Sequence, residues 1–478
     1  MVATSARLHA MTLVAPLKTP VNPTQKLTHR LAPELRRLRA WALAKHIPRG
    51  VRDAEFLALI QRIDPTAMHD APPIEQYVDG EVAFNAVIHA LNAAREEVLL
   101  ETYILRDDRV GERVKHALIA ASKRGVRVSV LADAVGSVAT ADVFWRSLES
   151  DGVTVRLFHR VWRRPFEALI RDHRKIIVID RFTAFTGGMN IGVEYGSSIH
   201  KKSDAFRDTF IRVEGTIARE LAAVFAEGWD RAQGPSLPGL EYVSWSSTIV
   251  APHQHGLRRL GARAWRARLA RRLARREDRR RGRRVVREVT ATDERERTLL
   301  VLDPRPGRGQ REMIAVLAAL LGGARKHLWI TTPYFAPPTR AIRLLMAAAR
   351  CGVDVRLMLP GPRTDVPLAR HAAHGAYSKL LASGVRIFEY QAATLHAKTM
   401  VVDGYASVIG SSNLDFRSLW LNAECNLLIF DMAYGQALAE TFAADAAASV
   451  EITRANWQTR SLRHRMWDRF ARSVRWAL

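Results

Sequence analysis

Two copies of one eight-residue pattern are the part of this sequence best suited to catalysis. Residues 173–180 and 396–403 both read His-x-Lys-x-x-x-x-Asp. In each copy an asparagine follows 17 residues after the histidine, at Asn190 and Asn413. One copy could arise by chance, but two copies with the same downstream spacing indicate an internal duplication whose halves share one task.

The histidine and lysine of each copy have the chemistry needed to act on a phosphate diester. In an extended chain, side chains two residues apart project from the same face, which pairs His173 with Lys175 and His396 with Lys398. An imidazole can attack phosphorus, and an ammonium offsets charge on the phosphoryl oxygens. If the two pairs meet, one histidine would attack while the other protonates the leaving alkoxide. They would then start in opposite protonation states, which histidine can supply near neutral pH.

Other polar residues near the two patterns could complete such a site. Each histidine needs an orienting partner on its other ring nitrogen, and downstream carboxylates occur at Asp208 and Glu424. The side chains able to donate hydrogen bonds to a phosphate are Asn190, Ser411 and Asn413. A single His-x-Lys pair on a strand is usually an exposed polar pair, so it is the duplication that favours a functional site.

The spacing of the other histidines and of the cysteines predicts neither a metal site nor a cofactor. His371 and His374 lack convergent ligands by spacing, and we expect them at surface or loop positions. The two cysteines, Cys351 and Cys425, fit neither a metal-ligand spacing nor a disulfide framework. A reducing compartment is the simplest interpretation.

The secondary-structure pattern around the two copies also repeats. Helices over 83–97 and 111–125 alternate with strands over 98–104, 126–133 and 153–158 ahead of the first copy. Strands over 327–335, 353–360 and 385–390 precede the second copy in the same order. Alternating helices and strands predict an α/β fold with two layered halves and mixed or largely parallel sheets.

The domain boundaries follow from this repeat. We expect a basic N-terminal extension over 1–71, a first α/β domain over 72–240 and a second over 298–450. An Arg-rich linker over 241–297 separates them, and a basic amphipathic helix over 451–478 ends the chain.

Composition restricts the class of protein and of partner. Hydrophobic residues make up 48% of the 478 residues, enough for a sizeable core. The mean hydropathy of −0.11 excludes a polytopic membrane protein. The sequence has no run of about 18 apolar residues, the length needed to span a bilayer. The first 20 residues match a secretory signal poorly. The net charge of +25 favours a polyanion, either nucleic acid or an anionic membrane surface.

Three basic amphipathic segments bear on that choice. They lie at 31–47, 255–288 and 462–478, and each places apolar residues at helical spacing beside several arginines. Each could be a helix that packs on the protein or stays solvated, or an interfacial helix lying on anionic lipid. The second segment also carries Trp265, and the third carries Trp467 and Trp476. Together they favour a membrane surface over nucleic acid.

These motifs resemble those of the phospholipase D superfamily, whose signature is the paired His-x-Lys-x4-Asp pattern. The segments 187–195 and 410–424 resemble bacterial cardiolipin synthases of the short form without N-terminal transmembrane helices. The resemblance implies two repeated phospholipase D-like α/β sandwich domains, related by a pseudo-twofold axis, with the active site at their interface. The copies depart from equivalence where Arg181 and Gly188 stand in place of Gly404 and Ser411.

The resemblance also implies an activity. A phosphatidyl group would move from phosphatidylglycerol to a catalytic histidine and then to a second phosphatidylglycerol. His173 would be the nucleophile and His396 the acid. The residues implied to bind phosphate are Lys175, Lys398, Asn190, Ser411 and Asn413. Asp208 and Glu424 would orient the histidines, and Asp180 and Asp403 would complete the catalytic signature.

The same resemblance implies partners and a location. Anionic phospholipids, phosphatidylglycerol and cardiolipin, would be the partners, and nucleic acid would not. The protein would attach peripherally to a bacterial cell membrane through its basic amphipathic segments, as a monomer that holds a complete site without a cofactor. Two alternatives stay open. One is a phospholipase D-type phosphodiesterase or nuclease with water as acceptor, and the other is a membrane-surface scaffold with a relic site.

Overall fold

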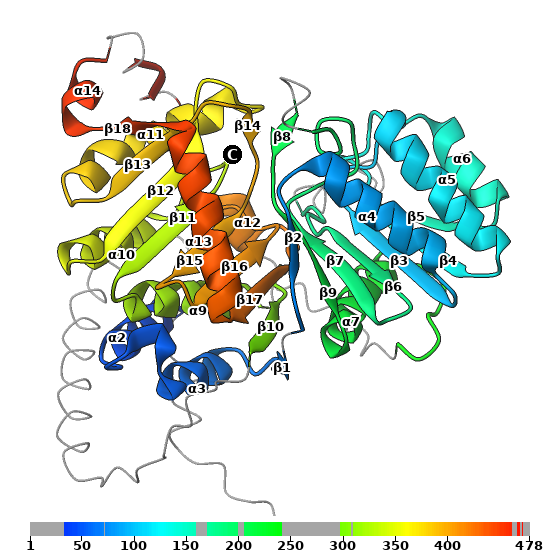
Figure 1. Ribbon diagram of the computed structural model, residues 1–478, viewed down its shortest axis with the longest axis horizontal. Helices are drawn as coiled ribbons and strands as arrows, with labels where there is room; N and C mark the ends of the chain where they lie inside the picture. Colours follow the sequence, from blue (N-terminus) through cyan, green and yellow to red (C-terminus); the bar gives the residue numbers. More distant parts are fainter. Residues whose placement is uncertain are drawn as a thin grey trace, which may run out of the picture.

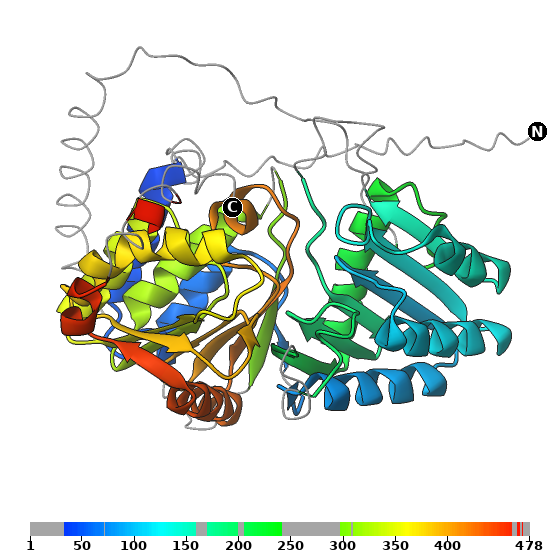
Figure 2. The same ribbon diagram turned by 90° about the horizontal axis from the view of Figure 1, so that it is seen from above.

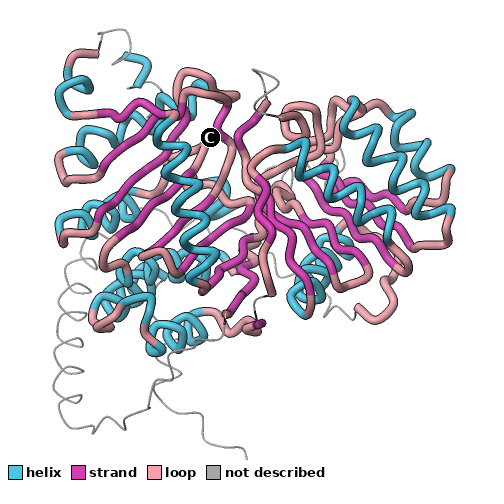
Figure 3. Tube along the Cα trace, viewed as in Figure 1, coloured by secondary structure: helices cyan, strands magenta, loops and turns pink. Residues whose placement is uncertain are grey.

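The computed structural model describes residues 33–70, 72–158, 170–198, 205–240, 297–306, 309–460, 466–468 and 471. Two α/β halves lie side by side (Figure 1, Figure 2), each built on one large mixed sheet covered by helices on both faces (Figure 3). The predicted duplicated α/β fold is therefore confirmed. The two amphipathic segments at 255–288 and 462–478 lie outside the described residues, apart from 466–468 and 471.

The first half contains a seven-stranded sheet with a parallel part and an antiparallel part. In sheet order its strands are β2 (Glu75–Tyr77), β9 (Phe210–Glu214), β7 (Thr183–Gly187), β6 (Ile176–Ile179), β3 (Glu97–Thr102), β4 (Arg127–Asp133) and β5 (Thr154–Phe158). β3, β4 and β5 are parallel, whereas β6, β7 and β9 run antiparallel to their neighbours.

Three helices cover one face of this sheet and a fourth packs on the other. The first three are α4 (Gly80–Ala93), α5 (Arg109–Lys123) and α6 (Asp142–Ser150), and the fourth is α7 (Thr216–Arg231). α4 and α5 begin where aspartates accept main-chain N–H groups, Asp79 those of residues 81 and 82 and Asp108 those of residues 110 and 111. These caps fix the start of each helix and the strand-to-helix turn before it.

The second half repeats the arrangement with a nine-stranded sheet. In sheet order its strands are β1 (His69–Asp70), β10 (Thr298–Leu302), β17 (Asn426–Phe430), β16 (Ala406–Gly410), β15 (Thr399–Val402), β11 (His327–Thr331), β12 (Asp354–Pro360), β13 (Arg386–Tyr390) and β18 (Ser449–Ile452). One face carries α9 (Gln310–Gly323), α10 (Thr339–Arg350) and α11 (Pro367–Leu381). The other carries α13 (Met432–Ala447), which crosses the sheet in Figure 1.

The two halves share a hydrophobic core as well as a boundary. Leu221 and Phe225 of α7 belong to the same buried cluster as Leu299 of β10, Ile409 of β16 and Leu427 of β17. A two-stranded parallel sheet, β8 (Phe206–Arg207) with β14 (Thr394–Leu395), also joins the halves. The relative position of the halves is therefore fixed by burial and by main-chain hydrogen bonds.

The N-terminal segment is not a separate extension where the structure describes it. α2 (Pro33–Lys45) and α3 (Ala54–Ile63) pack against the second half, and β1 adds a strand to the edge of its sheet. Ala40 and Ala44 of α2 are buried in the second core. The helix predicted over 31–47 is thus present, and its described part packs on the protein. The face that packs is the one carrying these alanines.

The predicted boundaries are close to the observed ones where hydrophobic periodicity is strong. Residues 98–104 were expected as a strand and β3 covers 97–102, while the helix expected over 111–125 is α5 at 109–123. None of the helices in the described ranges has both the length and the apolar character needed to cross a bilayer.

Candidate active site

The two histidines of the repeated pattern meet at the boundary between the halves. His173 lies just before β6 and His396 just before β15. The main-chain N–H of His173 donates to the carbonyl oxygen of Ala423 at 2.8 Å, and that of His396 donates to the carbonyl oxygen of Arg207 at 2.8 Å. Each histidine is therefore held by a segment of the opposite half.

The carboxylates predicted to orient the histidines contact them across this boundary. His173 Nδ1 lies 2.9 Å from Oε2 of Glu424, and His396 Nδ1 lies 2.6 Å from Oδ2 of Asp208. All four side chains are nearly or fully buried. With Nδ1 bonded to a carboxylate, Nε2 of the His173 ring remains for chemistry, whereas Nε2 of His396 lies 3.1 Å from Lys398 Nζ. Neither half could form a complete pair alone.

The two lysines lie within this buried group. Lys175 Nζ donates to the main-chain carbonyl of His173 at 2.7 Å. Lys398 Nζ lies 2.7 Å from Nδ1 of His396 and also donates to the main-chain carbonyl of that residue. Lys175 is 1% exposed and Lys398 4% exposed. Two buried cations beside two histidines form a site for an anion.

Burial controls the protonation of the histidines. Removal from water, together with the nearby Lys175, outweighs the opposing effect of Glu424 and lowers the pKa of His173 to about 4. Burial and the Lys398 ammonium likewise lower the pKa of His396. Both rings are therefore neutral at neutral pH. The opposite protonation states expected from the sequence thus require a bound anion.

The lysines and the orienting carboxylates are shifted in a consistent way. Burial lowers the pKa of Lys175 to about 7 and that of Lys398 to about 8. Burial opposes ionisation of Asp208 and Glu424, but Lys398 and the His396 ring outweigh it for Asp208, and the His173 ring and Lys175 outweigh it for Glu424. The pKa of each carboxyl is therefore lowered, and both remain ionised as hydrogen-bond acceptors.

The three uncharged residues among those predicted to bind phosphate have different surroundings. Asn190 Oδ1 accepts the main-chain N–H of Ile104 at 3.2 Å. Asn413 is 3% exposed, and its Oδ1 has no hydrogen-bond partner among the described atoms. Ser411 Oγ instead donates to Oε2 of Glu424 at 2.5 Å. Ser411 therefore supports the carboxylate that orients His173, and the structure does not direct it to a phosphate.

A glycine occupies the position in the first half that matches Ser411. A Cβ atom at Gly188 would overlap the Oδ1 atom of Asp208. The shorter aspartate thus approaches its strand more closely than Glu424 does, and only a residue without a side chain leaves room for it. The different residues at the two positions follow from the different lengths of the two carboxylates.

The aspartates of the repeated pattern, predicted to complete the catalytic signature, lie away from the histidines. Asp180 and Asp403 follow β6 and β15, at the opposite ends from the histidines. Asp180 accepts the N–H groups of residues 95–97 at 2.8–3.0 Å, and Asp403 accepts those of residues 325–327 at 2.7–2.9 Å. Each carboxylate therefore joins its own turn to the start of the neighbouring strand. The four-residue strand between them separates it from the histidine of the same pattern.

These aspartates also lie in turns with an unusual backbone. Asp180 and Arg181 have φ of 52° and 51°, and Asp403 and Gly404 have φ of 54° and 62°. Arg181 thus adopts the conformation that glycine supplies in the second copy, at a conformational cost. Its guanidinium is held by Glu97 Oε2 at 2.7 Å, which helps to retain this turn.

Aromatic residues that the sequence reasoning missed surround the histidines. The Tyr103 ring centroid lies 5.1 Å from that of His173, while Tyr195 and Tyr334 lie 5.2 and 6.3 Å from His396. All three rings meet the imidazoles nearly edge-on. Tyr103 follows β3 directly and Tyr334 lies three residues after the end of β11, so their place after a buried strand was the available signal.

A buried arginine inside the first pattern links the halves. Arg174 lies between His173 and Lys175 in sequence, and its Nη2 contacts Glu227 Oε2 at 2.7 Å and Asp303 Oδ1 at 2.5 Å. Glu227 belongs to α7, whereas Asp303 follows β10 in the second half. The second copy has the buried Ala397 at this position. Since a strand alternates faces, an arginine here must enter the core and needs anionic partners.

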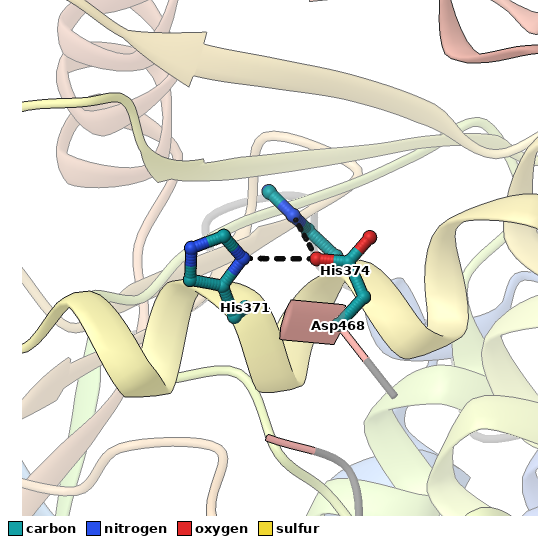
Figure 4. A group of neighbouring side chains, drawn as sticks. All are labelled: His371, His374 and Asp468. Carbon is teal, nitrogen blue, oxygen red and sulfur yellow. Dashed lines mark hydrogen bonds and ion pairs between the residues drawn. The ribbon is translucent and has the colours of Figure 1, made fainter. Parts of the chain in front are cut away.

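The structure corrects the expectation for His371 and His374. Both lie on α11, His374 is buried, and both Nδ1 atoms lie 2.9 Å from Oδ1 of Asp468 (Figure 4). The three could hold a metal ion by their proximity. However, the separations are hydrogen-bond lengths, and His374 Nε2 also contacts Glu389 at 3.2 Å. Burial disfavours its charged form, but the bonds to Asp468 and Glu389 outweigh burial and raise the pKa of His374.

Comparison with known families shows that one family matches both halves. The family described as "Cardiolipin synthase, PLD-like domain" matches residues 87–229 and 317–446. These two ranges contain both histidines, both lysines and the two carboxylates that contact the histidines.

Named relatives match most of the chain. "Cardiolipin synthase" of Geobacillus sp. (strain WCH70) is 30% identical over 437 residues, which cover 91% of this chain and 78% of the relative. "Cardiolipin synthase 1" of Bacillus cereus is 27% identical over 431 residues, covering 90% and 77%. The crystal structure of phosphatidylserine synthase from Haemophilus influenzae Rd KW20 aligns with a TM-score of 0.62 and 16% identity, covering 89% of this chain and all of that one. That last similarity supports the fold alone.

Proposed function

Because the chain belongs to the phospholipase D-like family described as cardiolipin synthase, we propose that it transfers a phosphatidyl group between two phosphatidylglycerol molecules. The observation that carries the proposal is the crossed pairing of His173 with Glu424 and His396 with Asp208. It provides two oriented imidazoles on one buried site that also contains two lysines. A phosphate diester placed between them meets a nucleophile, an acid and two cations.

The first step of the reaction releases glycerol. Nε2 of His173 attacks phosphorus, the bond to the glycerol oxygen breaks, and a phosphatidyl-histidine forms. The phosphate that enters is an anion, which favours the charged form of a neighbouring imidazole. His396 becomes protonated on that account and gives its proton to the leaving alkoxide. Glu424 stabilises the positive charge that develops on the His173 ring.

The second step of the reaction reverses these roles with a new acceptor. A primary hydroxyl of the second phosphatidylglycerol loses its proton to His396 and attacks phosphorus. The bond between phosphorus and His173 breaks, which releases cardiolipin and restores the neutral ring. Lys175, Lys398, Asn190 and Asn413 would hold the phosphoryl oxygens in both steps. If water took the place of this hydroxyl, the same residues would produce phosphatidic acid.

One observation favours His173 as the nucleophile. Its side chain is 10% exposed, whereas that of His396 is 4% exposed, so a donor reaches His173 more readily. We further propose that the positive protein associates peripherally with an anionic bacterial membrane, because its net charge of +25 is attracted to anionic lipid.

Trapping the covalent intermediate tests this assignment. Wild-type protein would be mixed with phosphatidylglycerol labelled at phosphorus, quenched at alkaline pH within one turnover and digested. We expect label on the peptide that contains His173 and none on the peptide that contains His396. Label on His396 alone would reverse the two roles, and glycerol release without any labelled peptide would contradict the covalent mechanism.

A further inference from the structure

An apolar pocket in the second half lies next to the candidate active site. It is formed between α9 and α10, with Pro337, Pro338 and Leu414 at one side. Its cavity volume is about 70 Å³, and its walls are mainly apolar. The space therefore suits a narrow apolar group and has few groups that would bind a polar one.

This pocket borders a second one that reaches residues beside the second histidine. The second pocket shares Leu317, Met400 and Leu414 with the first and is also lined by Lys398 and Asn413. It includes Asn413, a buried residue whose Oδ1 has no hydrogen-bond partner among the described atoms. Apolar residues thus adjoin a cation and an amide, which is the order of groups along a phospholipid.

The matching helix of the first half is packed more tightly at two positions. α4 and α9 both end before an alanine that precedes the next strand. Counting back from those ends places Ile314 and Leu317 at the positions of Phe84 and Val87. Phe84 and Val87 are fully buried, whereas Ile314 and Leu317 remain partly exposed. At these two positions the second half is therefore more open than the first.

We propose that this pocket, lined by α9, α10 and Leu414, binds one acyl chain of the phospholipid whose phosphate lies between the histidines. The inference rests on the proposed function, since it needs a lipid phosphate in the site. It adds the part of the enzyme that recognises the lipid tail. Each methylene buried there would strengthen binding by a factor of about four, and the fixed tail would hold the phosphate near His173 and His396.

Dependence of the reaction on acyl-chain length tests the pocket. Ala341 of α10 lines it, and Ala341→Trp would fill part of the space. Ala347 lies six residues further along the same helix and outside the lining, so Ala347→Trp is the matched control. Kinetics would be measured with dihexanoyl and dioctanoyl phosphatidylglycerol below their micellar concentrations, and with bis(p-nitrophenyl) phosphate, which has no acyl chain.

We expect kcat/KM of the wild type to rise at least tenfold from the dihexanoyl to the dioctanoyl lipid. In A341W this ratio should fall to about two, while A347W should keep the wild-type ratio. Leu344→Gln places a polar group in the same pocket with little change in volume, and it should flatten the ratio as well if tryptophan disturbs folding. Equal ratios in A341W, L344Q, A347W and the wild type would overturn the proposal.

The same experiment separates this proposal from the proposed transferase activity. If the wild type converts phosphatidylglycerol to phosphatidic acid, the transferase assignment fails, but chain-length dependence of that hydrolysis still reports on the pocket. If it makes cardiolipin with a kcat/KM that is independent of chain length, the transferase assignment stands and the pocket assignment fails. Turnover of bis(p-nitrophenyl) phosphate shows in each variant that the histidine site is intact.

Discussion

At the scale of single residues, the two halves reach the same geometry with different side chains. Asp208 contacts His396 because Gly188 leaves room for the shorter carboxylate, and Glu424 contacts His173 with support from Ser411. Either pairing positions an Nε2 atom for chemistry. Substitution of Gly188 and substitution of Ser411 should therefore lower kcat/KM by different amounts.

Gly188→Ala should lower kcat/KM at least about a hundredfold, since its Cβ would displace Asp208 from His396 and misplace the ring. Ser411→Ala removes one hydrogen bond to Glu424 and should lower kcat/KM by about tenfold. Steady-state kinetics with phosphatidylglycerol would measure both, with thermal unfolding as the control for folding. Wild-type activity in G188A would contradict the role given to Asp208.

Asp180→Ala should destabilise the fold and leave the chemistry intact. It would deprive three main-chain N–H groups of an acceptor, at a cost of about 2–3 kcal/mol in the free energy of unfolding. Asp180→Asn keeps one acceptor and tolerates a positive φ, so it should cost less. Urea denaturation would measure the difference. A D180A protein of normal stability but without activity would contradict this structural role and support a catalytic one.

At the scale of elements, sequence periodicity predicts the strands and helices but not what they contact. β3 and α5 lie within two residues of the expected boundaries because alternation and helical spacing are local properties. The contact of His173 with Glu424 depends on how two halves dock, and spacing within one half contains no such information. The same holds for α2 and α3, whose apolar faces gave no indication that they would pack on the second half.

The contact of α11 with Asp468 should depend on pH. The raised pKa of His374 means that its contribution is complete below the unfolded value near 6.5 and is lost as pH rises through the folded pKa. Burial opposes ionisation of Asp468, but hydrogen bonds from His374 and His371 lower its pKa to about 2. Its contribution is therefore present above about pH 3.9 and is lost as pH falls toward 2.

The difference in unfolding free energy between the wild type and Asp468→Asn should consequently be largest between about pH 4 and 6.5 and shrink in more alkaline solution. Chemical denaturation across this range would measure it. A difference that stays constant from pH 5 to pH 10 would contradict a charged His374–Asp468 pair.

At the scale of the whole molecule, the halves form one cooperative unit. The buried cluster that includes α7, β10 and β17 crosses their boundary, and so does the ion network of Arg174. The active site exists only when the halves are docked, because each histidine takes its carboxylate from the other half. Separate unfolding of one half would therefore abolish activity completely.

Arg174→Met tests this unity. It would remove the cation that pairs with the buried Glu101 and leave Glu227 and Asp303 with Arg305 alone, which should cost about 3–5 kcal/mol. Arg386→Met, which breaks the exposed pair with Glu451, should cost about 0–1 kcal/mol and serves as the control. Calorimetry should show one transition in the wild type and in both variants, with a clearly lower Tm only for R174M. Two well-separated transitions in the wild type would contradict a single unit.

The most direct measurement is the product of the reaction on phosphatidylglycerol vesicles. Wild type, His173→Ala and His396→Ala would be incubated with labelled vesicles in the presence of a chelator, and the lipids and water-soluble products separated. The account predicts one glycerol released for each cardiolipin formed by the wild type, and neither product from the two variants. Phosphatidic acid in place of cardiolipin, or cardiolipin made equally well by either variant, would contradict phosphatidyl transfer at this site.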